Sequence, residues 1–191
     1  AGQQSDIGKV INSYISGATI SVYEEDSDTI IAQTTSDSFG NYAITYQTYA
    51  NYVTIKCSGG IINVTDVSFN GLYKVIRIVD LDLEGRNVIS STTTNINPFT
   101  TIIAGIFKIL VQSSETTDFQ SIIDTATTIL VNVMGNIDGT NNLTVDNIQN
   151  DYMALQDLDV YRASLKLSNL IAIIFSALDN SSSEEVSDSI A

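Results

Sequence analysis

The sequence predicts an α+β protein in which a β-sandwich is followed by a small helical bundle. Apolar and polar side chains alternate with a period of two over residues 7–82, and apolar side chains recur every three or four positions over residues 98–179. The chain has 191 residues, of which 43% are hydrophobic, so it can form a sizeable core. We expect four segments: a sandwich domain at 1–86, a linker at 87–97, a helical bundle at 98–179 and an acidic polar tail at 180–191.

The N-terminal half predicts about seven short antiparallel strands, separated by polar turns. In the segment GATISVYE, Ala18, Ile20 and Val22 share one face of a strand. The segments NYAITYQ and NYVTIKC alternate in the same way. The first directs Tyr42, Ile44 and Tyr46 toward a core, and the second directs Val53, Ile55 and Cys57. Short strands at regular spacing are typical of a seven-stranded antiparallel sandwich.

Four helices are predicted in the C-terminal half. Asn97 suits the N-cap of the first helix, and Pro98 suits its first helical position. The segment TTDFQSIIDTATTILVNVMG carries a three-four apolar stripe that ends at Gly135, and a short third helix is expected after Thr144. The fourth helix is apolar on nearly every side from Leu170 to Leu178. Because such a helix must be buried on every side, it requires packing on the sandwich or on another subunit.

Charge and residue content exclude several classes of function. The net charge is −14, from 8 basic and 22 acidic residues, and nucleic-acid binding needs the opposite sign. With no histidine and one cysteine, the chain cannot form a Ser-His-Asp or Cys-His nucleophilic site, an imidazole-containing zinc site or an internal disulfide. We interpret Cys57 as a small buried hydrophobic residue. No phosphate-binding loop is present and no pair of carboxylates stands out, so we expect a protein that is not an enzyme.

Several features favour an extracellular or cell-surface location. The chain begins with AGQQSD rather than Met, which predicts a mature N-terminus left by signal-peptide removal. No apolar run reaches the roughly 20 residues needed to cross a bilayer, so no transmembrane segment is expected. Only 16% of residues are charged, so the polar surface consists largely of Ser, Thr, Asn and Gln, as is common in secreted proteins.

Two groups of side chains are candidate ligand sites. Asp80, Asp82 and Glu84 in DLDLEG could project from one side of an extended segment and bind calcium, the one cofactor that the sequence suggests. The alternative is a solvated strand end that enters the linker. A set of tyrosines could bind a glycan or a partner protein by stacking, or could serve only as strand formers. These are Tyr23, Tyr42, Tyr46, Tyr49, Tyr52 and Tyr73.

A Gly-x-Val strand, a Gly-Ala-x-Val-like strand and a Thr-x-Asp-x-x-Gly-x-Tyr turn follow one another near the N-terminus. Their residues are Gly8, Val10, Gly17, Ala18, Ile20, Val22, Thr35, Asp37, Gly40 and Tyr42. Over residues 7–83 this pattern resembles the carboxypeptidase regulatory-like or transthyretin-like β-sandwich. The resemblance implies a stalk or accessory module of a secreted or surface protein. The segment NPFTT, at 97–101, is similar to the start of the helical segment that follows such sandwiches in some bacterial surface proteins.

We expect a secreted structural protein that assembles with copies of itself into an extracellular filament, sheath or surface appendage. The candidate interface consists of apolar helical side chains: Ile102, Ile103, Ile106, Phe107, Leu170, Ile171, Ile174, Phe175 and Leu178. The segment SDIGKVI could in addition be donated as a strand to a neighbour's sheet. Two alternatives stay open. One is a monomeric cell-surface binding or adhesion module that contacts a glycan, a host surface or calcium, and the other is an accessory domain of a larger enzyme.

Overall fold

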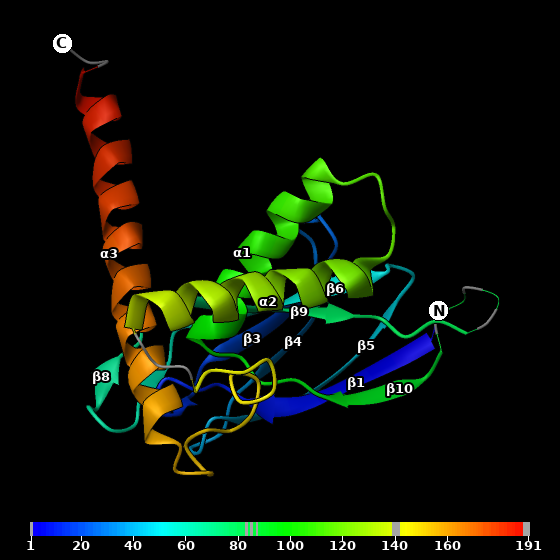
Figure 1. Cartoon of the computed structure of the whole chain (residues 1–191), viewed down its shortest axis with the longest axis horizontal. Coiled ribbons are helices and arrows are strands. Elements are labelled where there is room, and N and C mark those ends of the chain that lie inside the picture. The colour runs from blue at the N-terminus through cyan, green and yellow to red at the C-terminus, as the bar shows by residue number, and fades with distance from the viewer. Residues whose placement is uncertain (1, 83, 85, 87, 139–141, 189–191) are drawn as a thin grey trace.

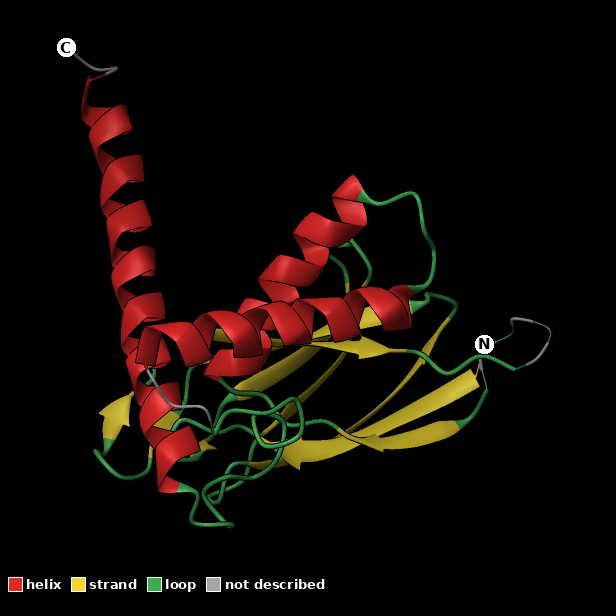
Figure 2. Cartoon of the chain, viewed as in Figure 1, coloured by secondary structure: helices red, strands yellow, loops and turns green. Residues whose placement is uncertain are grey.

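The computed structural model describes residues 2–82, 84, 86, 88–138 and 142–188, and it confirms the α+β class (Figures 1 and 2). Of the side chains, those of 136–138, 175 and 178–188 are not described. The strands are β1 (Gly2–Lys9), β2 (Ile15–Ser16), β3 (Thr19–Glu24), β4 (Ile30–Thr35), β5 (Asn41–Thr48), β6 (Tyr52–Ser58), β7 (Ile61–Ile62), β8 (Val67–Ser68), β9 (Leu72–Ile78) and β10 (Ser90–Thr93). The helices are α1 (Pro98–Ser113), α2 (Phe119–Asp138) and α3 (Leu158–Asp188).

The strands form two main sheets and one small sheet, so the predicted seven-stranded antiparallel sandwich is not matched in detail. One main sheet has the order β10-β1-β5 and the other the order β4-β3-β6-β9, while β2, β7 and β8 form the small sheet. β10 lies within the predicted linker and pairs with β1 in parallel. Its sequence SSTT has no apolar alternation, and for that reason the hydrophobic pattern did not indicate a strand.

The predicted inward faces of the strands are confirmed. Ala18, Ile20 and Val22 are fully buried, as are Val53, Ile55 and Cys57, and Tyr42, Ile44 and Tyr46 are at most 5% exposed. In the four-stranded sheet, Ile20 lies opposite Cys57 and Val22 lies opposite Ile55. The opposite face of β6 carries Tyr52, whose ring packs on Phe107 of α1 and Phe119 of α2 with centroid distances of 4.9 and 5.2 Å. The four-stranded sheet is therefore covered on both faces.

A buried ion pair connects the two main sheets. Asp6 of β1 and Arg77 of β9 have side chains that are 0% and 3% exposed, and Arg77 Nε lies 3.3 Å from Asp6 Oδ1. Asp6 also accepts hydrogen bonds from Tyr46 Oη at 2.6 Å and from Thr94 Oγ1 at 2.7 Å. Arg77 Nη2 donates to Ser90 Oγ and Thr92 Oγ1 of β10. This network holds β10, which lacks an apolar face, beside β1.

The first turn of α1 is built on the exposed edge of β9. Asn97 is the N-cap, and its side chain accepts a hydrogen bond from the Thr100 main-chain N–H while the Thr100 hydroxyl accepts one from the Asn97 N–H. Thr100 Oγ1 also donates to the Lys74 carbonyl, and Thr101 Oγ1 accepts from the Lys74 N–H. The two threonines of NPFTT therefore satisfy a main-chain pair that the edge strand leaves open.

The predicted third helix is wrong, because the segment after Thr144 forms turns. Thr144 and Asn147 exchange hydrogen bonds between their side chains and main-chain N–H groups. The side-chain amide of Asn97 donates a hydrogen bond to the Ile148 carbonyl at 2.9 Å, and that of Asn95 donates one to the Gln149 carbonyl at 3.0 Å. Local and long-range amide hydrogen bonds thus replace the helical ones.

The other two helix ends also differ from expectation. α2 continues past Gly135 to Asp138, and α3 continues to Asp188, through much of the segment expected to be a polar tail. A single buried cluster joins side chains from both main sheets and from all three helices. Within the described residues, no helix has the length and apolarity required to span a membrane.

Replacing Arg77 by Met is expected to lower the free energy of unfolding by about 3–5 kcal/mol, because Asp6 would remain buried without its cation. Arg86→Met is the matched control. Arg86 pairs with Asp82 and Glu84 at an exposed site, so its loss should leave the stability nearly unchanged. Urea unfolding of the two variants measures the difference, and equal effects would contradict a structural role for the buried pair.

Thr54→Val is expected to raise the free energy of unfolding by about 1 kcal/mol. Thr54 is 1% exposed, and its hydroxyl finds no hydrogen-bond partner among the described residues. Valine keeps the shape and removes the unpaired hydroxyl. Thr48→Val is the control, since the equally buried Thr48 hydroxyl donates to Glu24 and accepts from the Ala50 N–H at 3.0 Å. The control should be destabilised in the same urea titration.

Candidate functional site

The predicted interface residues divide into buried and exposed groups. Ile103, Phe107 and Ile171 are at most 6% exposed and belong to the core of this chain, whereas Ile102 and Ile106 are partly buried. Leu170 and Ile174 are 51% and 47% exposed. The side chains of Phe175 and Leu178 lie outside the described residues. The buried members fill this molecule's own interior, so only the exposed members remain candidates for contact with another molecule.

The exposed members lie on α3, on either side of the buried Ile171. In Figure 2, the C-terminal part of α3 extends well beyond both sheets and the other helices. Three neighbouring apolar side chains of α3 are about half exposed or more: Leu170, Ile173 and Ile174. We refer to these three residues as the α3 apolar face. Ile173, the most exposed at 66%, was not among the predicted interface residues.

The acidic segment Asp80–Glu84 is organised around two arginines. Arg86 Nε lies 2.8 Å from Asp82 Oδ2, Arg86 Nη2 lies 2.6 Å from Glu84 Oε2, and Arg77 Nη2 lies 3.9 Å from Asp80 Oδ2. Hydrogen bonds from the main chain and guanidinium of Arg86 hold the pKa of Asp82 below its ordinary value. Among the described residues, no group of three or more His, Cys, Asp or Glu side chains could hold a metal ion. Calcium binding here therefore stays a prediction without geometric support.

The six tyrosines do not form a common surface. Tyr42, Tyr46, Tyr52 and Tyr73 are at most 4% exposed, and Tyr49 is the one that is strongly exposed. The Tyr23 ring is covered on one side by Lys56 Nζ, 3.8 Å from its centroid. Four of the six therefore act as core and strand-forming residues in this fold, and they are not available for stacking on a ligand.

The segment SDIGKVI lies within the chain's own sheet. β1 pairs with β5 along its whole length, from Gly2 opposite Thr48 to Lys9 opposite Asn41. Asp6, in the middle of this segment, makes the buried ion pair with Arg77. Donating this strand to a neighbour would break that pair, so the segment is an integral strand and not a free arm.

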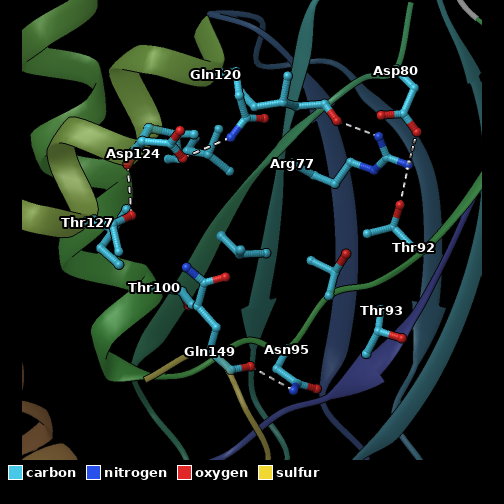
Figure 3. Close-up of a pocket in the computed structure, with 16 residues that line it drawn as sticks. Arg77, Asp80, Thr92, Thr93, Asn95, Thr100, Gln120, Asp124, Thr127 and Gln149 are labelled. Atoms are coloured by element: carbon cyan, nitrogen blue, oxygen red, sulfur yellow. Dashed lines mark hydrogen bonds and ion pairs between the residues drawn. The ribbon is translucent and has the colours of Figure 1, made fainter. Parts of the chain in front are cut away.

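A pocket of about 310 Å³ lies between β9, β10, α1 and α2 (Figure 3). Its polar lining includes Arg77, Asp80, Thr92, Thr93, Thr94, Asn95, Thr100, Gln120, Asp124, Thr127 and Gln149. Its apolar lining is formed by Val75, Ile76, Ile78, Ile103 and Ile123. We refer to this site as the β9–β10 pocket.

The described lining of the β9–β10 pocket carries one basic and two acidic side chains. Arg77 is the one basic residue of the described lining, and its guanidinium is committed to Asp6 and to β10. Asp124 accepts a hydrogen bond from Gln120 Nε2 at 2.9 Å, and the Asp80 side chain is 57% exposed. Beside these charges, the described lining supplies hydroxyls and amides.

The sequence did not indicate this pocket. Its residues come from segments that are far apart in the chain, and Thr92–Asn95 belong to a polar stretch without any motif. A run of Ser and Thr is usual in a linker, so its composition carries no signal for a binding site. Neither a family model nor a curated protein matches the chain.

The free energy of unfolding is expected to fall as the pH rises above about 10. Burial raises the pKa of Tyr42, Tyr46, Tyr73 and Tyr152, in the case of Tyr73 to about 12. Unfolding would release these protons near the ordinary pKa, so the folded state binds more protons in this range. Each buried tyrosine contributes a loss of about 1.4 kcal/mol per pH unit.

Urea unfolding between pH 8 and pH 11 measures this slope. Tyr73→Phe should make it shallower, whereas Tyr49→Phe, at an exposed position, should leave it unchanged. Burial also raises the Cys57 pKa to about 12, so a thiol reagent should label Cys57 only after unfolding. A flat pH dependence together with rapid labelling of the native protein would contradict this burial.

Proposed function

We propose that this chain is a structural subunit that associates with copies of itself through the α3 apolar face, forming an extracellular filament, sheath or appendage. The observation that supports the proposal is the exposure of Leu170, Ile173 and Ile174 on a helix that extends beyond the body of the protein (Figure 1). Apolar side chains clustered on one exposed face commonly mark interaction surfaces.

The energy available from covering this face is substantial. Full burial of a Leu or Ile side chain contributes roughly 1.5–3 kcal/mol, and these three side chains still have about half of that surface to bury. Further exposed apolar side chains occur on α1 and α2, namely Ile109 at 66% and Val133 at 48%. A repeated contact of about 1,600 Å² would be a standard stable interface.

The distribution of charge also supports association at α3. The whole chain carries a net charge of −14, so copies repel one another in general. The stretch from Leu165 to Ala177 contains no acidic residue and one lysine. An interface on this stretch therefore avoids the repulsion, and raising the salt concentration should strengthen association by screening the remaining charge.

A filament further requires that the contact be heterologous, with different surfaces of successive copies meeting, since such a contact need not close. The α3 apolar face on one copy and the exposed residues of α1 and α2 on the next would form such a pair. The extracellular location is supported by the resemblance of the N-terminal strands to surface-protein sandwiches.

The double variant Leu170→Asp/Ile173→Asp is expected to abolish self-association and give a species of 20.6 kDa. Asn169→Asp/Ser176→Asp is the matched control, because it adds the same charge at exposed polar positions of the same helix. Analytical ultracentrifugation and negative-stain microscopy measure assembly, and circular dichroism checks that both variants remain folded.

Two results would contradict the proposal. The wild-type chain could remain a single 20.6 kDa species at high concentration and in high salt. Alternatively, the control variant could disassemble as completely as the α3 variant, which would show that added charge alone prevents association. A monomeric protein would favour the alternative of a cell-surface binding module, for which the β9–β10 pocket is a candidate site.

A further inference from the structure

We propose that the β9–β10 pocket binds an extended peptide segment carrying a basic residue, which pairs with the open main-chain edges of β9 and β10. The proposal is independent of self-association, because the pocket shares no residue with the α3 apolar face. It is carried by the main-chain groups of Ile76 and Thr93 and by the charge of the surrounding side chains.

β9 is an edge strand of the four-stranded sheet, with β6 on its one paired side. Lys74 lies opposite Lys56, and its N–H and C=O point away from β6, because both bond to the threonines of α1. Main-chain direction alternates along an antiparallel strand, so Ile76 and Ile78 also point outward. The Ile78 carbonyl is occupied by the Arg77 guanidinium.

Along this edge both main-chain groups of Lys74 and the carbonyl of Ile78 are bonded, and Ile76 lies between them. Within the described part of the chain, the outward N–H and C=O of Ile76 have no hydrogen-bond partner. Ile76 lines the β9–β10 pocket, so this open pair lies at the pocket wall. A donor and an acceptor spaced as in a strand are complementary to the main chain of another extended peptide.

β10 presents a second open edge to the same pocket. It is the terminal strand of its sheet, and Thr94 N–H donates to the Ile7 carbonyl of β1 at 2.8 Å. In a parallel ladder alternate residues bond to the neighbour, so the main chain of Thr93 points away from β1. Thr93 is exposed and lines the pocket. An added strand could thus pair with either edge, or bridge both.

The side chains around these edges define the chemistry of the peptide. Ile76, Ile103 and Ile123 provide apolar contacts for one set of alternating side chains. Asp80 and Asp124 provide negative charge, and the guanidinium of Arg77 is already paired, so a basic residue is favoured over an acidic one. No aromatic ring is among the described lining residues, which disfavours a sugar held by stacking. At about 310 Å³ the pocket encloses only a short segment.

The test uses the full chain and a capped peptide, Ac-KTVTVTK-NH2. Binding is measured by amide NMR titration and hydrogen exchange. We expect saturable binding and slowed exchange at the Ile76 and Thr93 amides. A peptide of the same sequence with alternate main-chain nitrogens methylated should bind at least tenfold more weakly, because it keeps the charge and lacks the donors. Replacing both lysines of the peptide by glutamate should also abolish binding.

Matched variants locate the site. Thr93→Pro removes the outward N–H of β10 inside the pocket, whereas Ser91→Pro removes the N–H at the exposed, outward-facing position outside it. Asp124→Asn removes one negative charge from the pocket, whereas Asp118→Asn removes one from an exposed position outside the pocket. The first member of each pair should weaken binding, and the second should not.

Equal binding of the methylated peptide would overturn the proposal, because attraction to the acidic protein would then explain the affinity. Unprotected amides at Ile76 and Thr93 would overturn it as well. The α3 double variant should bind the peptide as the wild type does. Loss of peptide binding with intact assembly, or the reverse, therefore separates this inference from the proposed function.

Discussion

The ion pair between Asp6 and Arg77 joins the two main sheets where neither side chain reaches solvent. Burying two charges costs more than their attraction returns unless the remaining hydrogen-bonding groups are also satisfied. Here the hydroxyls of Tyr46 and Thr94 donate hydrogen bonds to the Asp6 carboxylate. The Arg77 guanidinium donates to the hydroxyls of Ser90 and Thr92 and to the Ile78 carbonyl. The same contacts fix the position of β10, whose polar side chains could not hold it against the core. One polar network thus determines how a strand without an apolar face enters the fold.

β9 connects this network to the helices. On one face of β9, the side chain of Arg77 extends between the two main sheets to Asp6. Along the outer edge of β9, the main-chain N–H and C=O of Lys74 bond to the hydroxyls of Thr101 and Thr100 at the start of α1. The position of α1 on the sheet is therefore set by the hydrogen bonds between its threonine hydroxyls and the main chain of Lys74, as well as by apolar packing. The open pair at Ile76 lies on the same edge, between Lys74 and the bonded carbonyl of Ile78.

The two surfaces proposed for recognition differ in chemistry and in place. The α3 apolar face offers hydrophobic area without acidic residues, and it suits permanent association between copies. The β9–β10 pocket offers main-chain edges and carboxylates within a small volume, and it suits a short extended segment. Asp82 and Glu84, which pair with Arg86, line neither surface among the described residues.

The local features of this protein could be predicted from its amino-acid sequence. The inward faces of β3, β5 and β6 and the capped start of α1 at Asn97 follow from periodicity and from neighbours within four positions. The features that join distant segments appear only in the folded chain. Asp6 contacts Arg77, which is 71 positions away in the sequence, and Thr94, which is 88 positions away. The segment after Thr144 forms turns because the side-chain amides of Asn95 and Asn97 donate hydrogen bonds to its carbonyls. The fold also places Ile103 in the core and leaves Ile173 exposed, although both lie in apolar stretches of their helices. Short-range patterns reveal which residues share a face, but what covers that face depends on pairings between segments that no local pattern specifies.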